Sequence, residues 1–325
     1  MSKCINVVSL FCGCGGLDLG MVGGFQFLNK KYKKNNIEIV YANDVNASAC
    51  KTYNHNFKAK CECLDINDVD YSALPDCDVV IGGFPCQDFS LAGKRKGFKT
   101  ERGTLYKQML NIVNYKRPKL FIAENVEGLI LELDGYSPIH TIMEDFKDIG
   151  YQVQYKLFNT ADFGVPQTRK RVIIVGVRSD INKKFEFPNS INEEWITVKE
   201  GIDDLWNLLG TNFVANHTEK DYSKAKFNPN GKGQGNRRLD PNKPSVTIRA
   251  EHHGNIEGHY RTLNDDPTNV TNWRRLSVRE CARIQSFPDN FVFPCGASSA
   301  YRQIGNAVPP VFSWYIAQQI ERFFD

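Results

Sequence analysis

The sequence has no long apolar run, and this absence excludes a membrane-spanning protein. No apolar segment approaches the roughly 20 residues that a helix needs to cross a bilayer. The start, Met1 to Ile5, lacks the charged and apolar regions of a signal peptide. We therefore expect a soluble, cytoplasmic protein without a membrane partner.

The chain also has little net charge and no low-complexity tract or internal repeat. Lysine plus arginine (41) outnumber aspartate plus glutamate (37) by four. Such a balance permits a nucleic-acid partner without requiring one. A length of 325 residues, 41% of them hydrophobic, is enough for a large core and predicts two domains rather than one.

The ten cysteines lack the spacing of a zinc site. Cys12-x-Cys14 and Cys61-x-Cys63 have one-residue spacers, whereas zinc sites usually have about two to four residues. The other metal candidate is a group of histidines without companion ligands at the usual spacing, His252, His253 and His259. We predict no metal and interpret most cysteines as small buried apolar residues.

What the chain does contain is an alternation of strand-like and helix-like segments through its first half. Apolar strand-like runs occupy residues 5–11, 37–42, 78–83, 119–123, 151–158 and 171–177. Helical spacing is found at 46–57, 104–115 and 308–324. This alternation predicts an α/β fold with a doubly wound, mostly parallel sheet and helices on both faces.

The alternation ends at about residue 180. Residues 181–272 are richer in Asn, Gly, Pro and Lys, and 228–236 have the composition of a loop. A strand-like piece at 245–249 interrupts this irregular stretch. Long irregular segments in folded chains are usually functional or disordered, and the strand-like piece favours function here.

A cysteine and a glutamate stand at the ends of two neighbouring apolar runs. Cys86 follows the run 78–83, and Glu124 and Asn125 follow the run 119–123. Ligands of α/β sheets bind outside the carboxyl ends of strands, so both groups should face one cleft. An isolated Pro-Cys pair is usually structural, but the preceding glycines and Glu124 favour a thiol nucleophile beside a proton donor.

Two arginines lead into a later strand. Arg169 and Arg171 alternate along an extended segment, so their side chains should point the same way. One or both could face the cleft and make it electropositive, as a reactive thiol requires.

A glycine-rich loop separates the first strand from the next helix. Phe11, Gly13, Gly15 and Gly16 form this loop, where glycine allows close backbone approach and a helix N-terminus favours negative charge. The spacing is not the G-x-G-x-x-G of dinucleotide sites, so hydride transfer loses support.

Two acids stand at strand ends: Asp44 follows the run 37–42, and Asp65 lies at the presumed end of a further strand, before the run 78–83. Asp44 could accept ribose hydroxyl groups, and Asp65 could accept from an adenine amino group. Either acid alone is more often a helix cap or a turn residue. Together they suit a cofactor that contains adenosine but no pyrophosphate.

Six sequence blocks extend from residue 5 to residue 310 and leave out only a variable region. In chain order the blocks are Phe11-x-Gly13-x-Gly15-Gly16, Gly83-Phe84-Pro85-Cys86-Gln87, Glu124-Asn125-Val126, Gln167-x-Arg169-x-Arg171, residues 275–283, and Gln303-x-Gly305-Asn306 with Pro309. With these blocks in this order, the chain resembles the DNA (cytosine-5)-methyltransferases of bacterial restriction-modification systems.

The resemblance implies methyl transfer from S-adenosyl-L-methionine to C5 of a cytosine flipped out of double-stranded DNA. Cys86 would attack C6 while Glu124 hydrogen-bonds N3 and the exocyclic amine. The addition makes C5 nucleophilic, and loss of the C5 proton and of the cysteine completes the reaction. Arg171 would contact the O2 edge of the base, and Asn125 and Arg169 would help to hold the site.

The resemblance also implies binding residues. The cofactor set is Phe11, Gly13, Gly15, Gly16, Asp44, Asp65, Gly83, Pro85, Leu105 and Asn306, with Asp44 standing where the family usually has glutamate. Residues 90–103 carry five basic residues and one acid, and they resemble the family's catalytic loop. The candidate DNA contacts are Ser90, Lys94, Arg95, Gln234, Arg237, Thr247 and Arg249.

By the same resemblance, residues 1–180 form the catalytic and cofactor-binding domain, completed by 300–325, and residues 181–299 form a target-recognition domain. The protein would act as a monomer on DNA and protect it from a separate cognate restriction endonuclease. Two other functions remain open. A tRNA cytosine-5 methyltransferase is disfavoured by the long variable region, and a non-catalytic DNA-binding module by the presence of every chemical residue.

Overall fold

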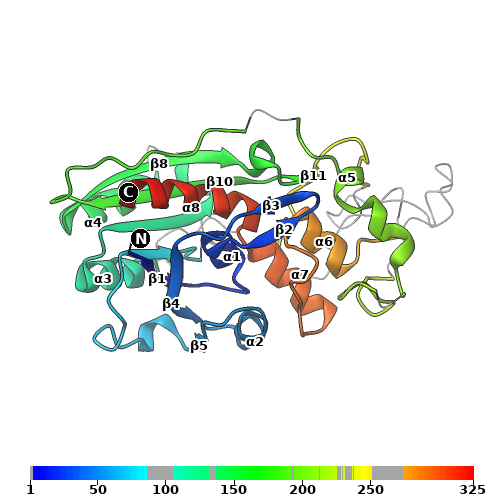
Figure 1. The fold of residues 1–325 in the computed structure, drawn as a ribbon, viewed down its shortest axis with the longest axis horizontal. Coiled ribbons are helices and arrows are strands. Elements are labelled where there is room, and N and C mark those ends of the chain that lie inside the picture. The colour runs from blue at the N-terminus through cyan, green and yellow to red at the C-terminus, as the bar shows by residue number, and fades with distance from the viewer. Residues whose placement is uncertain are drawn as a thin grey trace.

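The computed structural model describes residues 3–85, 105–131, 137–191, 194–211, 213–224, 228, 230, 236, 238–250 and 274–325. Figure 1 shows a central sheet with helices on both faces. Helices α5 (Val198–Ile202), α6 (Val278–Ile284) and α7 (Ala297–Asn306) lie beyond one end of this sheet.

The sheet has seven strands in the order β5-β4-β1-β6-β7-β10-β8. Neighbouring strands are parallel except that β10 runs antiparallel to both β7 and β8. The prediction of a doubly wound, mostly parallel sheet is therefore confirmed. The strands are β1 (Ile5–Leu10), β4 (Ile37–Asp44), β5 (Cys61–Cys63), β6 (Val79–Gly82), β7 (Leu120–Val126), β8 (Tyr151–Asn159) and β10 (Lys170–Arg178).

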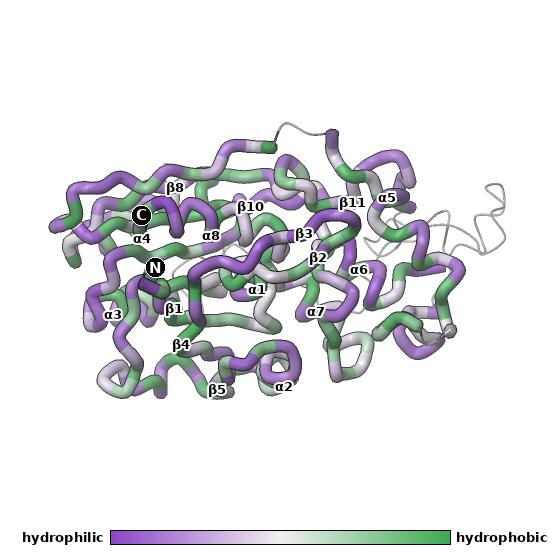
Figure 2. Tube along the Cα trace, in the orientation of Figure 1, coloured by the Kyte–Doolittle hydropathy of each residue, from purple (hydrophilic) through white to green (hydrophobic). Residues whose placement is uncertain are grey.

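The central strands are apolar on both faces because helices cover both. In β1, Ile5 and Val7 join one buried cluster, whereas Val8 and Leu10 join the other. The first cluster includes residues of α1 (Gly16–Val22), α2 (Ala47–Asn56) and α8 (Pro310–Phe324), and the second includes residues of α3 (Tyr106–Lys116) and α4 (Pro138–Asp148). Figure 2 shows the resulting hydrophobic colour along β1, β4 and β10. A strand buried on both sides reads as a continuous apolar run, which is why the sequence located these strands.

The C-terminal helix returns to the sheet and packs against α1. A side-chain carbon at Gly20 would lie 2.4 Å from the carbonyl oxygen of Pro310 and 2.4 Å from the Cβ of Ser313. Glycine at position 20 therefore lets α8 approach α1 closely.

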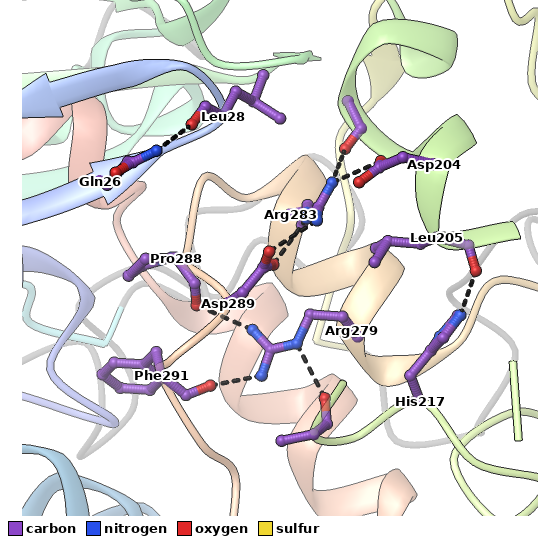
Figure 3. A network of polar contacts seen from close by, with 12 residues as sticks. Gln26, Leu28, Asp204, Leu205, His217, Arg279, Arg283, Pro288, Asp289 and Phe291 are labelled. Atoms are coloured by element: carbon purple, nitrogen blue, oxygen red, sulfur yellow. Dashed lines mark hydrogen bonds and ion pairs between the residues drawn. The ribbon is translucent and has the colours of Figure 1, made fainter. Parts of the chain in front are cut away.

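A third buried cluster joins α5, α6 and α7 away from the sheet. Buried arginines hold the loops around it, as Figure 3 shows. Arg279 donates to the carbonyl oxygens of Pro288 at 3.0 Å and Phe291 at 2.6 Å, and burial lowers the pKa of its guanidinium to about 10. Arg283 pairs with Asp204 and Asp289, each at 2.7 Å. Regular strands are short here and leave many backbone N–H and C=O groups without a strand partner. Side chains form hydrogen bonds to many of these groups instead.

Short elements complete the described chain. The strands β2 (Phe25–Phe27) and β3 (Lys30–Tyr32) form a hairpin, and β9 (Gln167–Thr168) pairs with β11 (Ser245–Val246). The 3-10 helices are η1 (Ile66–Asp68), η4 (Glu127–Ile130), η5 (Thr160–Phe163) and η6 (Asp203–Leu208). No helix in the described ranges is long and apolar enough to cross a membrane.

Candidate functional site

An ion pair lies at the carboxyl end of β7. The Oε1 atom of Glu124 is 2.7 Å from Nε of Arg171, and the two side chains are 10% and 11% exposed. The contact is an ion pair rather than an aligned hydrogen bond. Strand β10 begins where β7 ends, with Ile173 opposite Glu124, and this antiparallel register brings Arg171 to the carboxylate.

The end of β6 lies directly against this pair. A side-chain carbon at Gly83 would be 3.1 Å from Oε2 of Glu124, so glycine allows the carboxylate to approach. Nδ2 of Asn125 donates to the carbonyl oxygen of Phe84 at 3.2 Å, which fixes the segment leading to Pro85. The structure thus joins two of the sequence blocks, Gly83 to Pro85 and Glu124 to Asn125, at one edge of the sheet.

Cys86, the expected nucleophile, lies outside the described residues. The same is true of five of the candidate DNA contacts, Ser90, Lys94, Arg95, Gln234 and Arg237. Their roles remain predictions.

Arg169 is fully buried and bridges distant segments. Its Nη1 donates to the carbonyl oxygen of Ile248 at 2.9 Å, and its Nη2 donates to that of Gly305 at 2.8 Å. Burial lowers the pKa of the guanidinium well below its ordinary value, and the nearby charge of Arg171 lowers it further. The two arginines therefore differ: Arg171 reaches Glu124, whereas Arg169 links β9 and β10 to Ile248 and Gly305.

The glycine loop after β1 has one side open to solvent. Gly13 has a φ of 57°, and a side-chain carbon there would meet no atom within 4 Å. Phe11 also adopts a left-handed φ of 53°, which is unusual for a bulky residue and typical of functional loops. Gly15 and Gly16 pack against other parts of the protein instead. A side-chain carbon at Gly15 would lie 2.4 Å from the Phe57 ring, and one at Gly16 would lie 2.4 Å from the Val308 carbonyl oxygen.

Asp44 anchors this loop. Its Oδ2 accepts from the backbone N–H of Gly13 at 2.8 Å, and its Oδ1 accepts from that of Asn46 at 2.8 Å. Burial raises the pKa of the Asp44 carboxyl group, although these backbone donors lower it. Next to it, the apolar side chain of Val45 is 67% exposed.

Three other predicted cofactor residues stand at the ends of helices. Asp65 is exposed and caps η1 by accepting from the backbone N–H of Asn67 at 2.9 Å, and Leu105 is the N-cap residue of α3. Asn306 is exposed at the end of α7. The backbone after it reaches the glycine loop, since Gly16 closes against Val308.

The two described candidates for DNA contact follow β11. The hydroxyl group of Thr247 donates to the carbonyl oxygen of Thr168 at 2.9 Å, which ties Thr247 to β9. Arg249 is exposed, and its backbone packs so closely on Gly305 that a side-chain carbon at Gly305 would lie 2.5 Å from it. Arg169 and Gly305 therefore fix this segment relative to the ion pair.

Sequence reasoning missed Asp18, a buried carboxyl group beneath the glycine loop. It accepts from the Ser9 hydroxyl and from the Tyr53 hydroxyl, each at 2.7 Å. Burial raises its pKa from 3.8 to about 6 despite these two donors. The placement of an acid between Leu17 and Leu19 on a short apolar helix was the available signal.

Asp18 should make the stability of the protein fall as the pH rises. Between about pH 4 and pH 6 the folded protein holds a proton that the unfolded chain has lost, so the free energy of unfolding decreases through this range. Asp18→Asn is expected to remove this dependence, changing the difference from wild type by about 2 kcal/mol between pH 4 and 7. Urea unfolding across this range measures it. The exposed control Asp68→Asn should keep the wild-type profile, and parallel profiles for wild type and Asp18→Asn would contradict the assignment.

Among the described residues, no group of three or more His, Cys, Asp or Glu side chains is placed to hold a metal ion. The described site combines a paired carboxylate, the segment Gly83 to Pro85 beside it, and an open glycine loop with an acidic anchor.

Comparison with known sequences gives a consistent family. The family described as C-5 cytosine-specific DNA methylase matches residues 5–322. The type II methyltransferase M.NgoFVII of Neisseria gonorrhoeae is 38% identical over 94% of this chain and 83% of its own length. M.MthTI of Methanothermobacter thermautotrophicus is 36% identical over 98% of this chain and 97% of its own length.

Solved structures share the fold. A putative DNA modification methyltransferase from an E. coli prophage superposes with a TM-score of 0.73, at 21% identity, over 98% of this chain and 99% of the other. The Dnmt2 methyltransferase of S. pombe gives a TM-score of 0.67 at 19% identity, over 98% and 99% of the two chains. At these identities the likeness concerns the fold alone.

Proposed function

Because the chain belongs to the C-5 cytosine-specific DNA methylase family and is a DNA (cytosine-5-)-methyltransferase of the type II restriction-modification class, we propose that it acts through Cys86 on a cytosine flipped out of one specific double-stranded sequence. The observation that carries this proposal is the Glu124–Arg171 ion pair, which lies against the segment Gly83 to Pro85. Cys86 is joined to Pro85 by a single peptide bond.

Each group at this edge has a chemical task in the proposal. The Cys86 sulfur adds to C6 of the cytosine, and the Glu124 carboxyl group shares a proton with N3 and accepts from the exocyclic amine. Arg171 orients Glu124 and binds the O2 edge of the base. The Asn125 contact to Phe84 and the Arg169 contacts to Ile248 and Gly305 position these groups. Loss of the C5 proton then lets the sulfur leave C6.

The open glycine loop fits the adenosine-containing cofactor, S-adenosyl-L-methionine, which supplies the methyl group when bound. Gly13 has room for a ligand where a side chain would otherwise project, and the exposed Val45 offers an apolar contact to a base. Asp44 and Asp65 keep acceptor capacity for hydroxyl and amino groups beyond their backbone contacts. Gly83, Pro85, Leu105 and Asn306 complete the proposed set.

We assign DNA recognition to residues 181–299 and catalysis to 1–180 with 300–325. The third buried cluster contains most of the buried apolar residues of the recognition part and packs them against Cys14, Ala300, Tyr301, Ile304 and Ala307 of the catalytic part, and Arg169 connects this region to the ion pair. The proposed monomer would methylate host DNA and so protect it from a cognate restriction endonuclease that acts separately.

Methyl transfer to defined nucleic acids tests the proposed function. With labelled S-adenosyl-L-methionine and duplex DNA, we expect 5-methylcytosine at one recurring sequence, located by bisulfite sequencing. Transfer to tRNA in preference to duplex DNA would favour an RNA substrate, and binding of DNA without any transfer would favour a non-catalytic module.

A further inference from the structure

Four cysteines from three parts of the chain converge near the end of β4. Cys12 belongs to the glycine loop, Cys50 to α2, and Cys61 and Cys63 to β5. The Sγ atoms of Cys12 and Cys61 are 3.3 Å apart, and those of Cys61 and Cys50 are 3.5 Å apart. The Cys63 thiol donates to the Val45 carbonyl oxygen at 3.7 Å, and the Cys50 thiol donates to the neighbouring Asp44 carbonyl oxygen. Three of the sulfurs thus form a chain of contacts, and Cys63 stands next to it on the same strand as Cys61.

The four thiols lead from solvent to the interior. Cys63 is exposed, whereas Cys12, Cys50 and Cys61 are buried. A small oxidant can therefore reach Cys63 first, since Cys50, Cys61 and Cys12 are only 3%, 5% and 8% exposed.

The inner end of this chain lies in the loop that Asp44 anchors. The backbone N–H of Cys12 donates to Asn43 at 2.9 Å, and its neighbour Gly13 donates to the Asp44 carboxylate. The Cys50 thiol donates to the Asp44 carbonyl oxygen at 3.3 Å. Because a disulfide has an S–S distance of about 2.05 Å, a bond between Cys12 and Cys61 would draw the loop toward β5 by about 1 Å.

We propose that Cys63, Cys50, Cys61 and Cys12 form a thiol relay that carries a two-electron oxidation from solvent to the glycine loop and weakens cofactor binding there. The effect on binding rests on the proposed function, because it requires S-adenosyl-L-methionine to bind at this loop. The same thiols are not arranged as a metal site within the described residues, so bonding between sulfurs is the chemistry that their spacing favours.

The oxidant is a peroxide. The Cys63 sulfur attacks one oxygen of hydrogen peroxide, the O–O bond breaks, and a sulfenic acid and one water result. The Cys50 thiol then displaces hydroxide from that sulfur, and its proton leaves with the hydroxide as a second water. The product is a Cys50–Cys63 disulfide.

Two exchanges move the disulfide inward. Cys61 attacks the Cys50 sulfur and releases Cys63, and then Cys12 attacks the Cys61 sulfur and releases Cys50. Each attacking thiol gives its proton to the thiolate that is released. Overall, two thiols are oxidised and one peroxide is reduced to two waters. Burial raises the pKa of Cys12 to about 12, so thiolate is scarce and the relay should be slow.

Disulfide mapping tests the relay without reference to methyl transfer. The full chain carrying Cys86→Ser, which removes the proposed nucleophile thiol, is reduced, freed of reductant, and incubated with excess hydrogen peroxide. Samples are alkylated over time and digested without reduction for mass spectrometry. We expect a Cys12–Cys61 linkage that forms about tenfold more slowly when Cys63→Ser is added. The control Cys4→Ser, at a partly buried thiol outside the chain, should not change this rate.

Calorimetric titration with S-adenosyl-L-homocysteine tests the consequence. Oxidation is expected to weaken binding by about tenfold, within the usual range of coupling between two sites, and dithiothreitol should restore it. Absence of any linkage among the four cysteines, or a linkage that leaves affinity unchanged, would overturn the proposal. If the reduced protein does not bind this ligand at all, the proposed cofactor site fails, and the linkage map alone decides whether the relay exists.

Discussion

Replacing Glu124 by glutamine is expected to lower the rate of methyl transfer by about 10²- to 10⁴-fold, the usual contribution of a positioned acid or base. Glutamine keeps the size of the side chain, but it cannot share a proton with N3 of the base. It also removes the negative charge that faces Arg171 at 2.7 Å. Initial rates with saturating duplex DNA and labelled cofactor measure the effect.

A matched control is available at Glu127, three residues after Glu124 in the sequence. Glu127 pairs with Lys170 at 2.9 Å, much as Glu124 pairs with Arg171, but it is more exposed. Glu127→Gln should therefore leave the rate close to that of wild type. Full activity in Glu124→Gln, or equal losses in both variants, would contradict the role of Glu124. Retained cofactor binding in Glu124→Gln would exclude a general loss of structure.

Replacing Cys86 by alanine is expected to reduce methyl transfer below detection. C5 of cytosine is a weak nucleophile until a group adds to C6, and alanine offers no such group. Since alanine removes only one sulfur atom, binding of duplex DNA should persist. Filter binding and methyl transfer on the same preparation separate the two effects.

The control for this variant is Cys4→Ala. Cys4 is a partly buried thiol whose Sγ lies 3.7 Å from the Asn36 carbonyl oxygen, away from the ion pair. Its replacement should leave transfer unchanged. Measurable turnover by Cys86→Ala would show that another group adds to the ring, or that no addition occurs.

The position of Glu124 beside Gly83 and Pro85 could be predicted from the sequence. Buried parallel strands read as apolar runs, and the residues that follow them meet at one edge of the sheet. This reasoning identified the strand ends that the structure brings together, where a side-chain carbon at Gly83 would lie 3.1 Å from Oε2 of Glu124. It depends on local pattern and a general rule of α/β topology, so it needed no tertiary detail.

The separate tasks of Arg169 and Arg171 could not be predicted. Alternation along the chain placed both on one side, but β10 runs antiparallel to β7, and that register selects Arg171 for Glu124. Arg169 is directed by the carbonyl oxygens of Ile248 and Gly305, which are 79 and 136 residues away in sequence. Contacts of such separation leave no local signal.

The glycines of the loop show the same limit. The number of glycines in the loop predicted that a ligand approaches its backbone closely. At Gly16, however, the group that approaches is the Val308 carbonyl oxygen of the chain itself. Gly13 alone of the three has open space within 4 Å of a side-chain carbon. A glycine marks close approach, but the sequence does not say whether the approaching group is a ligand or the chain itself.

The most direct test of the central claim is a covalent trap with duplex DNA containing 5-fluorocytosine at the methylated position. Fluorine at C5 cannot leave as a proton does, so the sulfur should stay bonded to C6 after methyl transfer. We predict a complex that survives denaturation, with the nucleotide attached to Cys86 by peptide mapping. No stable complex on DNA that the protein methylates normally, or attachment to another residue, would contradict the account.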